Sequence, residues 1–225
     1  VEDKGVNFIG YKEEALPDNI KFGEIIGGDF LCSYGRFTSM KGFPTKVEGR
    51  FDMRYTKIKN FDGVPELTEI SDYAFAGCVY LQEVKIPSTV TKIGKHAFYN
   101  CSNLISYTQG NSMGADYIGE EAFYGCSKLD RIPVSETSGV KGVYSYSFAY
   151  TDIAGEFTTP ETLIDIGDYA FLGTKITKLT VPDTNQWDLI IGIGAFEDCY
   201  KLEEVTLPFI GASLDEMQYS WFGYI

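Results

Sequence analysis

The chain contains a single histidine, His96, among its 225 residues. One histidine excludes a zinc site with two histidine ligands, and it leaves a histidine-based catalytic triad without any alternative base. The sequence also lacks a Cys-x-x-Cys pair, a phosphate-binding glycine loop, a Gly-x-Ser-x-Gly nucleophile motif and a calcium-binding loop. We therefore expect no enzymatic activity, no bound metal and no cofactor.

Long apolar segments and basic clusters are missing as well. No stretch approaches the roughly 20 consecutive apolar residues that span a bilayer, so we expect no direct membrane insertion of this segment. The chain has 19 basic and 32 acidic residues, a formal net charge of −13. Such a charge repels phosphate backbones, so we expect no nucleic-acid partner. The first residues contain neither an initiator methionine nor an apolar signal core, which is typical of a trimmed or processed chain.

A repeat is the strongest feature of the sequence. Six copies carry a phenylalanine, usually preceded by alanine, at spacings of 23, 25, 25, 23 and 25 residues: Phe75, Phe98, Phe123, Phe148, Phe171 and Phe196. A weaker period of 21 residues lies upstream, where the segment 26–44 recurs as 47–65. Both periods fall in the range of leucine-rich repeats, about 20–29 residues. The sequence therefore predicts a leucine-rich-repeat solenoid with parallel strands on one face. Turns and short irregular or 3-10 segments should form the other face, with little regular helix.

The periods also predict the organisation of the chain. Residues 1–24 should form an N-terminal lead-in, residues 25–66 two degenerate 21-residue repeats, and residues 67–208 six repeats of 23–25 residues. Residues 25–208 should form one continuous solenoid. Trp221-Phe222 follows Phe196 by nearly one further repeat. Residues 209–225 are therefore expected to be a C-terminal cap or a truncated seventh repeat.

One repeat shows why the chain should coil. In the segment Glu83–Ile86, alternation places Val84 and Ile86 inward and Glu83 and Lys85 outward. Such a short strand cannot bury its apolar face alone, so successive copies should pair in parallel. A cysteine or threonine recurs at one phase: Cys78, Cys101, Cys126, Thr151, Thr174 and Cys199. We expect a column of reduced, buried thiols there, with a disulfide or metal site as the less favoured alternative.

The consensus Ile-Gly-x-x-Ala-Phe-x-x-Cys-x-x-Leu-x-x-Val-x-Ile-Pro resembles the BspA-type leucine-rich repeat of bacterial cell-surface proteins. The resemblance covers about residues 67–208. It implies a curved solenoid, an extracellular location at the cell surface and adhesion to host matrix proteins or other cells, and it implies no catalytic residues. The upstream units depart from the pattern. The fourth copy departs too, with Val143, Ser147 and Thr151 at motif positions, so we expect local irregularity there.

The outward strand positions are the candidate partner-binding residues. By phase they are Glu83, Lys85, Ser106, Thr108, Arg131, Glu156, Thr158, Lys178, Thr180, Glu204 and Thr206. Such a mixed polar face is typical of a solvated surface and equally of a wet protein interface. His96 occupies a phase held elsewhere by Tyr and Glu, which favours a solvent-facing position. The adjacent pairs Glu120-Glu121 and Glu203-Glu204 should also lie on solvated faces, away from any catalytic arrangement.

Three functions remain open from the sequence. The leading hypothesis is a non-enzymatic adhesion module that binds a protein partner through the solenoid face. A carbohydrate-binding module is the second, because the middle repeats are rich in tyrosine: Tyr99, Tyr124, Tyr144, Tyr146 and Tyr150. The third is a passive spacer within a larger surface protein. An exposed end coil would also make end-to-end association plausible.

Overall fold

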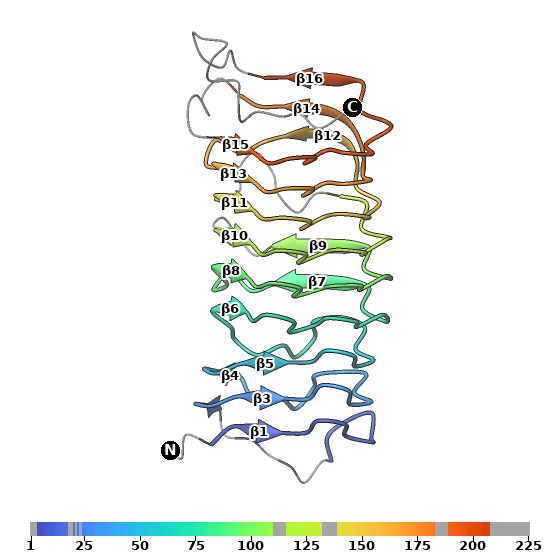
Figure 1. Ribbon diagram of the computed structural model, residues 1–225. Helices are drawn as coiled ribbons and strands as arrows, with labels where there is room; N and C mark the ends of the chain where they lie inside the picture. The colour runs from blue at the N-terminus through green and yellow to red at the C-terminus, as the bar shows by residue number, and fades with distance from the viewer. Residues whose placement is uncertain are drawn as a thin grey trace.

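The computed structural model describes residues 4–17, 20, 22, 24–109, 116–131, 139–182 and 189–207. Figure 1 shows the chain rising as a stack of parallel coils from β1 (Val6–Asn7) to β16 (Glu204–Thr206). All strand pairs in the described residues are parallel, and none of these residues lies in a helix. The predicted solenoid is therefore confirmed. The expected cap at residues 209–225 lies outside the described residues.

The longer strands form one face of the six C-terminal repeats. β7 (Glu83–Ile86) pairs with β9 (Ser106–Gln109), and β14 (Lys175–Thr180) lies between β12 (Ala154–Thr158) and β16. In β7 the inward residues Val84 and Ile86 are buried while Glu83 and Lys85 are exposed, as the alternation predicts. A bulge between Gly155 and Glu156 interrupts the pairing of β12 with β14. The irregularity expected in the fourth copy therefore lies in its strand.

The opposite face carries a second sheet that the sequence did not predict. Its strands are only two residues long and follow the order β15 (Ile190–Ile191), β13 (Asp165–Ile166), β11 (Gly142–Val143), β10 (Tyr117–Ile118), β8 (Lys92–Ile93) and β6 (Glu69–Ile70). The N-terminal coils have two small sheets. One contains β1, β3 (Phe30–Leu31) and β5 (Phe51–Asp52), and the other pairs β2 (Ile25–Ile26) with β4 (Lys46–Val47).

A column of phenylalanines runs through the middle of the six repeats. Their ring centroids are 5.1–5.4 Å apart and neighbouring rings lie within 17° of parallel: Phe75, Phe98, Phe123, Phe148, Phe171 and Phe196. The first five are fully buried, and Phe196 is half-buried. The repeat therefore places one aromatic ring per coil in a continuous core, which is the common core a solenoid needs.

The recurring glycine of the Ile-Gly pair lets adjacent coils approach closely. A Cβ atom added at Gly119 would lie 2.6 Å from the carbonyl carbon of Gly94 and 2.7 Å from its oxygen. At Gly192 the same atom would lie 2.5 Å from the backbone nitrogen of Asp168. Both neighbours are backbone atoms, so no rotamer change can make room for a side chain.

The cysteine column is buried, as predicted. The Cys101 thiol donates to the carbonyl oxygen of Phe75 and the Cys126 thiol to that of Phe98, both at 3.1 Å, and Cys199 donates to Phe171 at 3.3 Å. Each thiol thus bonds to the coil before its own. At the same phase the Thr151 hydroxyl donates to Phe148 within its own coil, at 2.8 Å. All five cysteines are buried and none is in a disulfide.

The thiols are expected to be chemically inert in the folded protein. Burial raises the pKa of Cys32, Cys78, Cys101 and Cys199, and only the thiolate reacts with disulfide reagents. Treatment with dithiobis(nitrobenzoic acid) at mildly alkaline pH should therefore release almost no chromophore from the native protein. Five equivalents should be released in concentrated guanidinium chloride. Rapid labelling of the native protein would contradict the buried column.

Candidate interaction surface

The longer strands place the predicted outward residues in columns. Glu83 lies opposite Ser106, and Lys85 lies opposite Thr108 on the backbone register, although the Thr108 side chain is outside what the structure describes. On the second sheet one column contains Glu156, Lys178 and Glu204, and a parallel column contains Thr158, Thr180 and Thr206. All the described side chains of this set are exposed or half-buried. The prediction that they face outward is therefore confirmed, whereas partner binding stays a prediction.

The structure divides this face into two parts. β7 and β9 form one sheet, and β12, β14 and β16 form another. Arg131 lies between them in a bend, with a side chain that is 93% exposed, and the residues that follow it, 132–138, are outside the described part of the chain. The strand face is thus described as two polar surfaces, which can be tested separately.

Alternating charge organises the C-terminal part of the face. The Lys178 Nζ lies 2.7 Å from the Glu204 Oε1, on the next strand. Glu204 raises the pKa of Lys178 by hydrogen bonding and by its charge, and the charge of Glu156 on the other neighbouring strand acts in the same direction. Opposite charges on adjacent strands favour this register. The surface therefore offers a Glu-Lys-Glu row to a partner.

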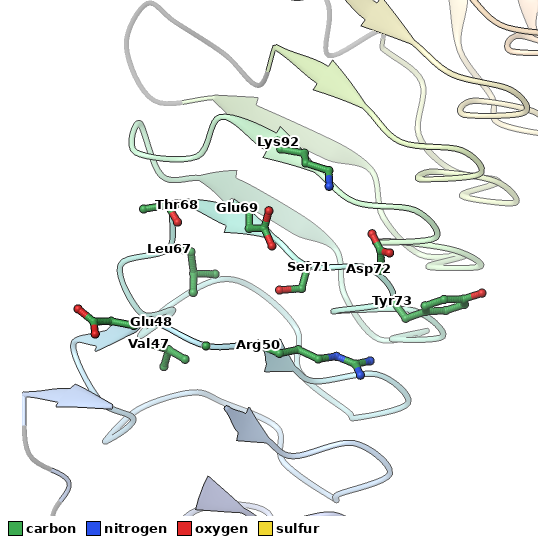
Figure 2. Close-up of a pocket in the computed structure, with 11 residues that line it drawn as sticks. Val47, Glu48, Arg50, Leu67, Thr68, Glu69, Ser71, Asp72, Tyr73 and Lys92 are labelled. Atoms are coloured by element: carbon green, nitrogen blue, oxygen red, sulfur yellow. The ribbon is translucent and has the colours of Figure 1, made fainter. Parts of the chain in front are cut away.

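A polar groove lies on the other face, between β4 and β6 (Figure 2). It has a volume of ≈ 820 Å³, and its lining includes the charged residues Glu48, Arg50, Glu69, Asp72 and Lys92. Figure 2 shows these side chains on the successive coils around the gap, with Tyr73 at one end. The sequence analysis did not identify this groove.

A change of register opens the groove. Lys46 pairs with Glu66, an offset of 20 residues. Further along the same two coils, Tyr55 lies against Gly77, an offset of 22 residues, and the Tyr55 amide donates to the Ala76 carbonyl. The upper coil therefore has two more residues than the lower coil between these points. No backbone hydrogen bond joins residues 47–52 to residues 67–73, all of which are described.

Buried charges hold the turn end of this groove. Asp52 is 2% exposed and receives hydrogen bonds from the Arg54 guanidinium, at 2.6 Å from its Nη2 and 3.0 Å from its Nε. These bonds raise the pKa of Arg54, which also lies 5.8 Å from the ring centre of Tyr73. The Arg50 Nη2 lies 3.3 Å from the same carboxylate. Arg50 is therefore already paired, which leaves Lys92 as the basic lining residue without an ion pair among the described residues.

Stacked aromatic side chains line the turn edge of the solenoid. Tyr73 stacks on His96 with ring centroids 4.6 Å apart, Tyr99 on Tyr124 at 5.2 Å, and Tyr146 on Tyr169 at 4.9 Å. Tyr73, His96, Tyr146 and Tyr169 have φ between 55° and 61°, a conformation that is unusual for bulky residues. One ring per coil at one phase thus forms a ladder. The recurrence of tyrosine at this phase was the available signal in the sequence.

The expectation that His96 faces solvent is wrong. Its side chain is only 14% exposed because the Tyr73 ring covers one face and Tyr99 packs nearby. Its Nε2 lies 3.3 Å from the Glu121 Oε2, and its Nδ1 is buried without a hydrogen-bond partner among the described residues. Phase alone could not predict this burial, because the same phase exposes the ring of Tyr73.

The paired glutamates do not converge on a site. Glu120 forms an ion pair with Lys95 at 2.8 Å, and Glu204 pairs with Lys178. Glu203 is exposed. Among the described residues, no group of three or more His, Cys, Asp and Glu side chains is arranged to hold a metal ion. The same residues include no helix long and apolar enough to cross a bilayer.

The family model of the BspA type leucine rich repeat region matches residues 49–171 and 137–224. The chain belongs to this family. The BspA-type assignment agrees with the resemblance seen in the repeat consensus, and it indicates no catalytic family. No curated protein matches the chain significantly.

Solved structures of other leucine-rich repeat proteins resemble this BspA-type chain. The leucine rich repeat protein of T. pallidum is 27% identical with a TM-score of 0.53, and the match covers 72% of this chain and 73% of that one. A leucine rich cell surface protein from Faecalibacterium prausnitzii is 27% identical over 63% of this chain and 43% of its own length, with a TM-score of 0.49. A leucine-rich repeat protein from Bacteroides ovatus is 30% identical, with coverage of 64% and 30% and a TM-score of 0.41.

Proposed function

We propose that this chain is a non-enzymatic, extracellular interaction module of a bacterial cell surface. It binds a protein partner, either a host matrix protein or another cell-surface protein, through the outward residues of its longer strands. The observation that carries the proposal is the charged row Glu156, Lys178 and Glu204, held in register by parallel pairing and by the Lys178–Glu204 ion pair. Extended repeat surfaces of this kind are commonly used for binding.

The chemistry of the face supports a protein partner. Charges of both signs and hydroxyl groups alternate along and across the strands, so a partner can be matched by charge and by hydrogen bonds in a wet interface. The side chains stand on a backbone that the buried core residues Phe157 and Leu179 fix from below. The binding groups are therefore preorganised, which lowers the entropic cost of association.

Binding of the chain to arrays of matrix proteins and glycans tests the proposal. Two double variants separate the two parts of the face: Glu83→Ala with Lys85→Ala, and Lys178→Ala with Glu204→Ala. We expect saturable binding to a protein that at least one double variant weakens by about tenfold or more, which corresponds to about 1.4 kcal/mol. Lys41→Ala with Glu161→Ala, at exposed positions outside these strands, is the matched control and should bind normally.

The tyrosines support glycan binding as the second candidate. Tyr144 and Tyr150 are 40% and 50% exposed, and Tyr150 packs edge-on against Tyr124 at 5.4 Å. Exposed rings with a hydroxyl tip suit sugar recognition. Glycan binding that survives both strand-face variants and is lost in Tyr144→Ala with Tyr150→Ala would support this candidate. If no array component binds, the spacer function is favoured.

A further inference from the structure

A second groove lies beside β7, on the strand face. It has a volume of ≈ 670 Å³. One wall is the β7 strand, and the other is the turn of the preceding coil, which includes Asn60, Phe61, Asp62 and Val64. The groove follows the first of the longer strands, so it lies where this face of the solenoid begins.

The turn opposite β7 satisfies its own backbone and does not pair with the strand. The Asp62 amide donates to the Asn60 Oδ1 at 3.1 Å, and the Val64 amide donates to the Phe61 carbonyl at 3.0 Å. Gly63 has φ of 83°, which ends any extended conformation there. The last backbone bond between the two coils before the groove is from the Gln82 amide to the Lys59 carbonyl, at 2.9 Å. β7 therefore pairs with β9 on one side only.

The unpaired edge of β7 presents backbone donors and acceptors to this groove. Glu83 is in register with Ser106, and the Ser106 amide donates to Gln82. In a parallel pair, alternate residues direct their amide and carbonyl groups to each side. Val84 and Ile86 therefore bond toward β9, whereas the backbone groups of Glu83 and Lys85 point toward the groove. Within the described residues these groups have no backbone partner.

We infer that the groove binds an extended peptide segment of a partner protein, which adds to β7 as one more strand. Main-chain hydrogen bonds supply affinity in such complexes, and pockets for alternate side chains supply specificity. The inference rests on the proposed function as an interaction module, and it specifies the form of the partner.

Charge complementarity defines the peptide. Its outward residues would lie beside Glu83 and Lys85, both exposed, and its inward residues would meet Val64 and Phe61 at the base of the groove. The same fold already pairs Lys178 with Glu204 at equivalent outward positions of neighbouring strands. The fitting segment therefore places a basic residue beside Glu83, an acidic residue beside Lys85, and apolar residues between them.

A blocked peptide of repeating Lys-Val-Glu-Val sequence tests the inference on the full chain. We expect saturable binding in calorimetry and slower amide hydrogen exchange at Glu83 and Lys85. The same peptide N-methylated on alternate residues, in two versions that each block one edge, should distinguish the edges. One version should bind as well as the parent peptide, and the other should lose at least tenfold in affinity. This comparison leaves the protein unchanged, so it does not depend on the folding of any variant.

A protein variant provides the matched control. Glu83→Pro removes a donor that faces the groove, at the first residue of a strand where proline is tolerated, and leaves the bonds to β9 intact. It should weaken the peptide at least tenfold, whereas Glu83→Ala, which keeps the amide, should weaken it less. Equal binding of both N-methylated peptides, absence of binding, or protection confined to β12, β14 and β16 would overturn the inference.

The two proposals fail in different ways. Array binding that is lost in the strand-face double variants but unaffected by the peptide as competitor would leave the proposed function standing and remove the β7 groove. Protection of Glu83 and Lys85 by the peptide without any array partner would support the groove and remove the proposed partners.

Discussion

Phe123→Ala is expected to lower the free energy of unfolding by about 3–5 kcal/mol, the usual cost of deleting a buried ring. Phe123 is fully buried and stacks between Phe98 at 5.1 Å and Phe148 at 5.3 Å, with the Tyr107 ring edge-on at 5.6 Å. Backbone hydrogen bonds fix the coils on both sides, so the cavity cannot collapse fully. Because each coil contacts only its neighbours, the loss should also weaken the coupling between the two halves of the stack.

Equilibrium unfolding in urea, followed by circular dichroism, measures this effect. Phe196→Ala is the matched control, because Phe196 is half-buried and stacks only on Phe171 among the described residues. We expect a smaller loss for the control and a broader transition for Phe123→Ala. Equal losses for the two variants would argue against a continuous phenylalanine core.

Gly119→Ala is expected to destabilise the protein by about 1–3 kcal/mol, in the range of overpacked sites. Its new Cβ would lie 2.6 Å from the carbonyl carbon of Gly94 in the preceding coil. Relief requires the two coils to separate, and this lengthens the bond from the Gly119 amide to the Ile93 carbonyl, now 2.8 Å.

Gly139→Ala controls for the intrinsic effect of adding a methyl group. A Cβ at Gly139 would meet no atom within 4 Å, and the residue is not among those with positive φ. Its stability should change by no more than about 0.5 kcal/mol. The same urea titration measures both variants. A similar small change for Gly119→Ala would show that the coils can separate at little cost.

The sequence predicted the parts of the fold that a period can encode. The spacing of the phenylalanines specifies one ring per coil, and the recurring Cys or Thr specifies a small buried side chain. The alternation in Glu83–Ile86 specifies which side chains face outward, and the structure confirms each of these. The second sheet was missed because a two-residue strand such as Lys92–Ile93 is too short to show an alternation.

The candidate site was harder to predict than the fold. The two grooves depend on how one coil registers on the next, and the shift from Lys46–Glu66 to Tyr55–Gly77 is a property of pairing that no single repeat contains. The burial of His96 likewise depends on the ring of Tyr73 in the coil before it. Binding by the outward residues remains a prediction from their phase and charge.

The register change between Lys46 and Tyr55 also bears on how such a chain can evolve. Among the later coils the pairing offset is set by the repeat itself, so recombination that adds or deletes a whole repeat there reproduces contacts that already exist. Across the seam, two coils of different length must meet, and a deletion would join partners that have never been selected together. Variation in repeat number among relatives should therefore accumulate on the C-terminal side of this seam, while the coils before it are inherited as one block.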